Sequence, residues 1–260
     1  MTKKVEATTA VTIIVLVLGL IAYGLNQIYW QVNDFKAPDW YPQVDVVIHE
    51  SDLMQSGTTF FGVNSIGDRE AAGRAAYFGY NETGELVWYY PDPEDEITSN
   101  CDLEVMSDGN YLIHIENGWR VITPDNKTLL EVTADDLGVD NIHHDVTFTP
   151  EGTFIAIANV TQEMKVDWVP GDRMAPILGE MLIEVDAGGK EIWRWNAFDY
   201  LDVDRVALEQ TMGDKSLDWL HANGIQYFEE DDSILVSFRS QSWVIKIDHA
   251  TGEVLWRLGA

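Results

Sequence analysis

Histidine, asparagine and arginine recur in this chain at spacings that suit the binding of an oxyanion. The candidate residues are His143, His144, His221, Asn223 and Arg239. Imidazole, carboxamide and guanidinium groups donate hydrogen bonds, and the guanidinium fork matches the oxygens of sulfate or phosphate in a way that Lys cannot. Because the chain carries a net charge of −28, cationic donors gathered at one point predict an anion site.

The positions of these residues come from a repeat. The runs 100–102 (Asn-Cys-Asp), 143–145 (His-His-Asp) and 221–223 (His-Ala-Asn) align at the starts of successive predicted strands. The alignment predicts equivalent places for His143 and His221 in neighbouring repeats, and it favours His143 over His144. Taken singly, each residue is more typical of a hydrogen-bonded corner or a turn cap than of a binding site, and only the joint pattern favours a site. Two His with one Asp could also hold zinc, but no third ligand is assured, so we expect neither a metal nor a cofactor.

Two kinds of β-hairpin alternate after about residue 40. The first kind covers residues 77–88, 121–130, 183–193 and 245–256, and every copy except the second ends in Trp. The second kind covers residues 102–115, 145–158 and 223–238. Two successive hairpins make a four-stranded antiparallel sheet, which is the blade of a β-propeller. We therefore predict an all-β fold in which residues 41–260 form about four blades of a ring left incomplete at the C-terminus. The uncovered edges of such a ring invite self-association.

Two stretches exceed the length that a blade needs. Residues 161–180 contain a Pro-Gly turn, and residues 196–219 contain a helix-like run at 203–212. Insertions of this kind sit on one face of a propeller and often wall its binding site, although mere decoration is an equal alternative.

The N-terminus predicts a membrane anchor at residues 1–40. Two lysines, Lys3 and Lys4, precede an uncharged stretch at 7–33 whose apolar centre is 11–25, which is long enough to cross a bilayer as a helix. Positive charge before the span predicts a single-pass protein with residues 41–260 on the extracytoplasmic side. The alternative is a cleaved signal peptide ending near residues 22–24 and a secreted protein.

Composition excludes other classes of function. Sixteen basic against 44 acidic residues repel nucleic-acid phosphates, so a nucleic-acid partner is not expected. The one cysteine, Cys101, can form neither an intrachain disulfide nor a cysteine zinc cluster.

Three segments carry a resemblance to a known family. Residues 141–152, 218–225 and 232–259 resemble the arylsulfate sulfotransferases, and the likeness extends from about residue 75 to the end. Its most specific part is His-x-Asn at 221–223 with Arg239 eighteen positions after the His. The resemblance implies a six-bladed propeller outside the cytoplasm that moves a sulfuryl group from a phenolic sulfate ester to a phenol without a nucleotide donor. It also implies a ping-pong mechanism through a sulfohistidine.

The same resemblance implies roles for the candidate residues. His221, Asn223 and Arg239 would bind the sulfuryl group, and His143 or His144 would be a further binding or proton-transfer residue. The family's nucleophilic histidine lies in a later blade, beyond residue 260. This polypeptide alone is therefore expected to be inactive, as a fragment of a longer enzyme or as a degenerate member.

No other histidine of the chain replaces the nucleophile at the sequence level. His49 precedes the blades, His114 lies in the middle of a predicted strand, and His249 lies in an outer turn. A different class of function also remains open, because residues 248–256 resemble the tryptophan-docking repeat of quinoprotein-like propellers. Some of those are non-catalytic scaffolds at the cell envelope, and that alternative needs no histidine cluster. Carbohydrate binding through exposed Trp residues is a weaker third alternative.

Overall fold

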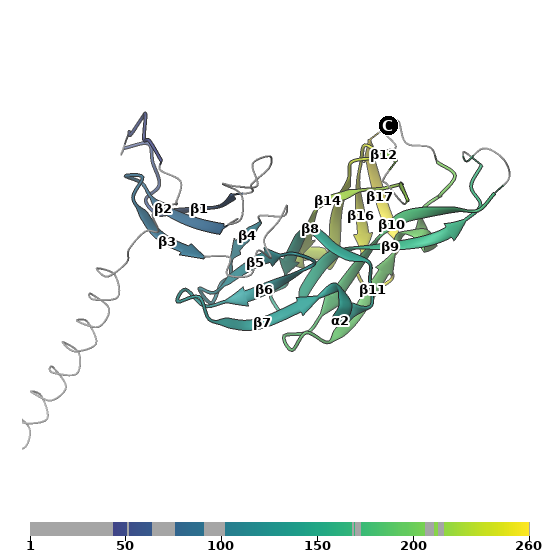
Figure 1. The fold of residues 1–260 in the computed structure, drawn as a ribbon, viewed down its shortest axis with the longest axis horizontal. Helices are drawn as coiled ribbons and strands as arrows, with labels where there is room; N and C mark the ends of the chain where they lie inside the picture. The colour runs from purple at the N-terminus through teal and green to yellow at the C-terminus, as the bar shows by residue number, and fades with distance from the viewer. Residues whose placement is uncertain are drawn as a thin grey trace, which may run out of the picture. The chain divides into compact units, whose positions relative to one another are not determined.

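The computed structural model describes residues 44–50, 52–63, 76–90, 102–167, 169, 173–205, 211–212 and 216–259 (Figure 1). The predicted anchor at residues 1–40 and the run Asn100-Cys101 lie outside these residues. Within the described part of the chain, no helix is both long and apolar enough to cross a membrane. The chain divides into two compact units, residues 1–58 with 80–87 and residues 59–79 with 88–260, and the second unit contains the candidate site.

The described strands form four sheets in a four-blade β-propeller arrangement, which confirms the all-β prediction. The first sheet has three strands in the order β1-β2-β3. Its strands are β1 (Thr58–Val63), β2 (Ala76–Asn81) and β3 (Leu86–Tyr90).

Each of the three later sheets contains four consecutive strands joined as antiparallel neighbours, as the hairpin repeat predicts, and two further short strands join the third sheet. The second sheet comprises β4 (Leu103–Val105), β5 (Tyr111–Ile115), β6 (Gly118–Ile122) and β7 (Thr128–Thr133). The third comprises β8 (Asn141–Phe148), β9 (Phe154–Met164), β10 (Ala175–Val185) and β11 (Glu191–Asn196). The fourth comprises β14 (Ala222–Phe228), β15 (Ser233–Phe238), β16 (Trp243–Asp248) and β17 (Val254–Gly259).

A side-chain cap explains why the first kind of hairpin recurs. In the third sheet, Oδ1 of Asp186 accepts hydrogen bonds from the backbone N–H groups of Gly188 and Lys190, and Gly189 adopts a φ of 81°. Asn81 caps the corresponding turn of the first sheet through the N–H groups of Thr83 and Glu85. An Asx turn followed by a left-handed residue reverses the chain in few residues.

The tryptophans of this repeat dock on the following sheet. Nε1 of Trp88 donates to the carbonyl of Pro124, 3.0 Å away, in the turn between β6 and β7. At the equivalent place two sheets later, the ring of Trp193 contacts His249 in the turn between β16 and β17, with centroids 4.7 Å apart. The outer-strand Trp therefore joins successive blades.

The two predicted insertions take the form of strands. β9 and β10 pair along their whole length, from Met164 opposite Ala175 to Phe154 opposite Val185, so the described part of residues 161–180 extends a hairpin. The prediction of a helix at 203–212 is wrong at its C-terminal end, where β12 (Thr211–Met212) pairs with β13 (Leu217–Asp218). Residues 206–210 lie outside the described residues. Because β13 runs parallel beside β10, pairing with the sheet overrides the local helical pattern.

Helices are few and short in the described residues. They are α2 (Ala134–Leu137), α3 (Ala197–Tyr200) and a 3-10 turn at Glu229–Asp231. Thr133 caps α2 in a capping box with Asp136, and Gly138 ends it with a φ of 64°.

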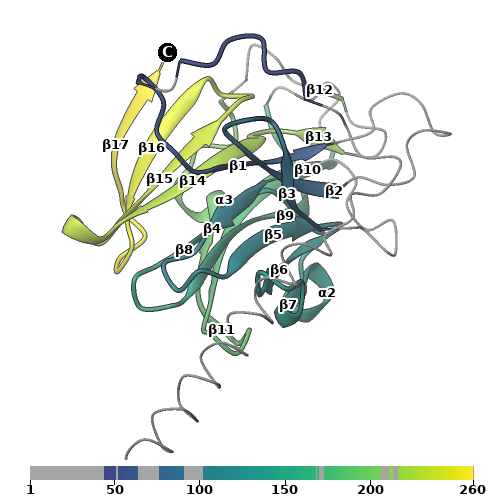
Figure 2. The ribbon, with the colours of Figure 1, turned by 90° about the vertical axis from the view of Figure 1, so that its left-hand side faces the viewer.

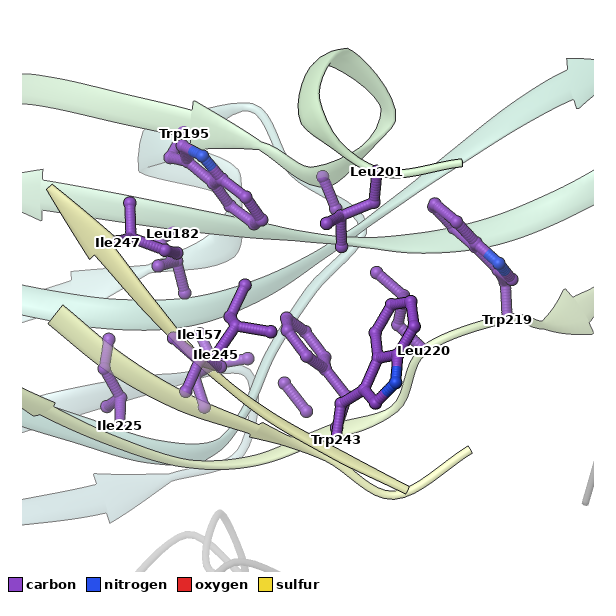
Figure 3. Packing of buried hydrophobic residues seen from close by; sticks show 14 of the residues in the cluster. Ile157, Leu182, Trp195, Leu201, Trp219, Leu220, Ile225, Trp243, Ile245 and Ile247 are labelled. Atoms are coloured by element: carbon purple, nitrogen blue, oxygen red, sulfur yellow. The ribbon is translucent and has the colours of Figure 1, made fainter. Parts of the chain in front are cut away.

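The largest apolar cluster of the described residues lies between the third and fourth sheets. Here β14 of the fourth sheet lies beside β8 of the third (Figure 2). Trp195, Trp219 and Trp243 are among its buried members, together with aliphatic side chains such as Leu182 and Ile245 (Figure 3). Burying a large apolar side chain contributes about 2 kcal/mol. This packing therefore holds the inner strands of the two sheets rigidly against each other at the candidate site.

Candidate active site

The backbone is strained where the candidate histidines lie. In β8 the pairing with β9 is interrupted between Ile142 and Val146, and within this irregular stretch His144 has a φ of 63°. His221 directly precedes β14 and has a φ of 54°. A left-handed conformation in a residue other than glycine costs about 1 kcal/mol or more and is most common at functional sites. Irregular strand pairing of this kind re-aims side chains.

Three imidazole rings converge at this place. The ring centroids of His143 and His144 are 4.9 Å apart, those of His144 and His221 are 5.0 Å apart, and those of His143 and His221 are 6.3 Å apart. We call these three residues the histidine cluster. The structure thus brings together three of the five residues that the sequence singled out, from two neighbouring sheets.

A buried carboxylate holds His143. Oε2 of Glu180, on β10, lies 2.9 Å from Nε2 of His143 and accepts a hydrogen bond from Nδ2 of Asn159 at 3.2 Å. Its Oε1 accepts the backbone N–H of Ala222 at 3.0 Å, which ties β10 to the start of β14. Glu180 is 1% exposed, so these partners replace its water entirely.

A second carboxylate orients His221. Oδ2 of Asp218 lies 2.5 Å from Nδ1 of His221 and 3.8 Å from Nη2 of Arg239. The backbone N–H of Arg239 also donates to the carbonyl of His221 at 2.9 Å. The fourth predicted residue, Arg239, therefore stands beside the histidine cluster with its side chain 43% exposed.

The fifth predicted residue, Asn223, lines an open pocket of about 350 Å³. Arg239 lines the same pocket, together with Ser237, Trp243 and Leu258. Arg239 and Asn223 thus line one pocket, and the guanidinium of Arg239 also lies near Asp218, the partner of His221.

His144 is neutral near pH 7. Burial lowers its pKa to about 4, and the neighbouring His143, His221 and Arg239 act in the same direction against the opposing effect of Asp218. Partial burial and three neighbouring basic groups therefore oppose a charge on this ring.

Three residues around the cluster escaped the sequence prediction. His114 on β5 is 1% exposed, and neither ring nitrogen has a hydrogen-bond partner in the described part of the chain. Its pKa is lowered to about 4 by burial and by His143 and His144. Asp218 begins the run 218–225 that already carried the resemblance, so its position three residues before His221 was a usable signal. Glu180 closed a predicted insertion and gave no signal.

Three carboxyl groups meet directly beside the histidine cluster. Single carboxylate oxygens of Asp102, Glu104 and Asp145 all lie within 4.8 Å of one another, and we call these residues the acid cluster. Burial and like charge raise the pKa of Glu104 to about 7 and that of Asp145 to about 6. Oδ2 of Asp145 also accepts the backbone N–H of Ile225 at 2.8 Å, which links β8 to β14. Desolvation, to which the repulsion between the carboxyls adds, accounts for these pKa values.

Comparison with known proteins gives one family. A family model described as Arylsulfotransferase (ASST) matches residues 43–260. A crystal structure of a protein of unknown function from Bacteroides caccae is similar over 78% of this chain and 73% of that chain, with 14% identity and a TM-score of 0.31. No curated protein sequence matches the chain.

Proposed function

This chain belongs to the arylsulfotransferase family, and from that premise we propose that its site transfers a sulfuryl group from a phenolic sulfate ester to a phenol. The observation that carries the proposal is the meeting of three imidazoles, two of them held by carboxylates, beside the guanidinium of Arg239. Titratable groups gathered with perturbed pKa values in this way are typical of a catalytic site.

The donor groups suit the oxygens of the sulfuryl group. Asp218 accepts the Nδ1 proton of His221, so the Nε2 edge of that ring donates to a sulfuryl oxygen in the imidazolium form. Arg239 and Asn223 line the adjoining pocket and offer further N–H donors. Donors fixed in advance where negative charge develops lower the barrier to group transfer.

The proposed mechanism is ping-pong. A histidine attacks sulfur, the donor phenolate leaves with the electrons of the broken S–O bond, and the sulfohistidine then passes the sulfuryl group to the acceptor phenol. In this proposal the nucleophile belongs to a later blade outside residues 1–260, and the residues described above bind the sulfuryl group and handle protons.

Binding of 4-nitrophenyl sulfate tests the proposal. We expect Arg239→Ala and His221→Ala each to weaken its binding at least tenfold in calorimetry, since each removes a donor aimed at the anion. Arg194→Ala is the matched control, because Arg194 pairs with Glu191 on β11 and should leave binding unchanged. Equal binding by all variants would favour the non-catalytic scaffold, in which the histidines have no ligand to hold.

Turnover tests the position of the nucleophile separately. Purified residues 41–260 should bind 4-nitrophenyl sulfate without releasing 4-nitrophenol to added phenol. Robust phenol-dependent release would instead assign the nucleophile to a histidine within this chain, and peptide mapping of a trapped sulfohistidine would identify it.

We further propose that the propeller acts on the extracytoplasmic side, anchored through residues 1–40. Protease added to intact cells should degrade residues 41–260 if this is so. Protection of these residues until the cells are lysed would contradict it.

A further inference from the structure

The hydrogen bonds of Glu180 determine where the protons of two histidines lie. The backbone N–H of Ala222 and the amide of Asn159 both donate to its oxygens, and a carboxylate can only accept. The contact of 2.9 Å between Glu180 and His143 therefore places a proton on Nε2 of His143. In a neutral ring, Nδ1 of His143 is then an acceptor.

The same reasoning applies to the ring of His144. Nδ1 of His143 and Nδ1 of His144 are 2.7 Å apart, so one of them donates and the other accepts. With His143 as the acceptor, the proton of His144 lies on Nδ1 and its Nε2 carries a lone pair. No described residue hydrogen-bonds that Nε2. This assignment is the one for a neutral His143 ring, and a second proton on His143 would reverse the bond between the two Nδ1 atoms.

A lone pair at this position selects between ligands. The oxygens of a sulfate ester are acceptors and gain nothing from another acceptor, whereas a hydroxyl group donates. Arg239 and the imidazolium form of His221 donate to the sulfuryl oxygens, and the ring of His144 is 5.0 Å from that of His221 between centroids. The donor side and the acceptor side of the site are thus adjacent.

We propose that Glu180 is a positioning residue which, through His143, keeps Nε2 of His144 as an open hydrogen-bond acceptor for the hydroxyl group of the acceptor phenol. The identity of the ligand rests on the proposed sulfuryl transfer, whereas the arrangement of protons does not. This arrangement gives the site a means to distinguish a phenol from a phenyl ether of the same shape.

Long-range ¹H–¹⁵N NMR of the imidazole nitrogens tests the proton positions without any substrate. In the wild-type chain at pH 7, the proton of His143 should be found on Nε2 and that of His144 on Nδ1. A proton on Nε2 of His144 would overturn the proposal, whatever the outcome of turnover assays. Loss of 4-nitrophenyl sulfate binding or turnover would instead bear on the proposed function and leave these signals unchanged.

Glu180→Gln should invert both tautomers. The N–H of Ala222 can only donate, so it takes the one oxygen of the new amide, and the NH₂ group then faces Nε2 of His143. His143 must accept there, its proton moves to Nδ1, and His144 keeps a proton on Nε2 only. Glu184→Gln is the matched control, because Glu184 lies on the same strand and engages a different imidazole, His249, at 2.8 Å. Unchanged tautomers in folded Glu180→Gln would overturn the proposal.

Titration with phenol and with anisole tests the ligand. Phenol should shift the Nε2 signal of His144 in the wild-type chain, and anisole, which lacks the hydroxyl proton, should bind at least tenfold more weakly. Equal responses to the two compounds would overturn the proposal. This comparison and the wild-type tautomers decide the matter even if Glu180→Gln fails to fold.

Discussion

The histidine cluster and the acid cluster adjoin each other on β8, yet burial shifts the pKa values of their members in opposite directions. His144 and Asp145 are consecutive residues, and burial lowers the pKa of the first to about 4 and raises that of the second to about 6. In the histidine cluster each carboxylate has an imidazole as partner, whereas in the acid cluster the neighbours of each carboxyl are further carboxyls. One region therefore keeps a defined arrangement of protons, and the other carries an electrostatic penalty.

The two regions give opposite pH dependence to folding. His114 and His144 take up a proton near pH 6.5 in the unfolded chain but only near pH 4 in the folded chain. The free energy of unfolding therefore decreases as the pH falls from about 6.5 to about 4. For Glu104 and Asp145 the folded chain binds protons that the unfolded chain releases, so stability is gained as the pH falls from about 7. Substitutions in each region can separate the two contributions.

The largest expected effect comes from His114. His114→Leu should gain up to about 3 kcal/mol over the wild type at pH 4 relative to pH 7, because a buried imidazole that cannot accept its proton is removed. Urea unfolding at both pH values measures this difference. A difference between variant and wild type that does not change with pH would show that His114 binds protons equally in both states.

Glu180→Gln should lower the free energy of unfolding by about 2 kcal/mol at pH 7, since a neutral amide replaces a buried, charge-assisted acceptor of three hydrogen bonds. Thermal unfolding and urea midpoints should agree. An increase in the free energy of unfolding would mean that burying Glu180 destabilises the fold more than its hydrogen bonds between β10 and β14 stabilise it.

The same chemical change in the acid cluster should have the opposite sign. Glu104→Gln should stabilise the chain by about 1 kcal/mol at pH 8, after allowance for the exposed part of this side chain, because it removes a partly buried charge and its repulsion by Asp145 and Asp102. At pH 5, where the carboxyl of the folded wild type is already protonated, the gain should vanish. Equal gains at the two pH values would point to packing rather than charge.

Salt should produce the smallest effect. Molar KCl screens the partly exposed carboxylates, so wild-type stability at pH 8 should rise by a few tenths of a kcal/mol more than that of Glu104→Gln. Parallel urea titrations in dilute and molar salt measure the difference. An identical salt response would assign the salt dependence to the overall charge of −28 instead.

Hairpins and blades could be predicted because each repeat carries its own turn chemistry, as at Asn81 and Asp186. The convergence of His143 and His221 could be predicted because aligned positions in successive repeats occupy equivalent places in neighbouring blades. The role of Glu180 could not be predicted, because it depends on the pairing of β9 with β10 and on the backbone of β14, and no local sequence pattern indicates either. The strand at 211–212 was missed for the same reason, because its partner lies in the sheet and not in the neighbouring sequence.

The left-handed backbone at His144 and His221 predicts which residues this chain's relatives carry at these two positions. At such a φ, glycine or asparagine would sit more comfortably than any imidazole-bearing residue. A related chain that does not need these two imidazoles would thus be more stable with glycine or asparagine at both positions. Under the proposed sulfuryl transfer, relatives that keep histidine at both positions should catalyse the reaction, and relatives with glycine at both positions should not.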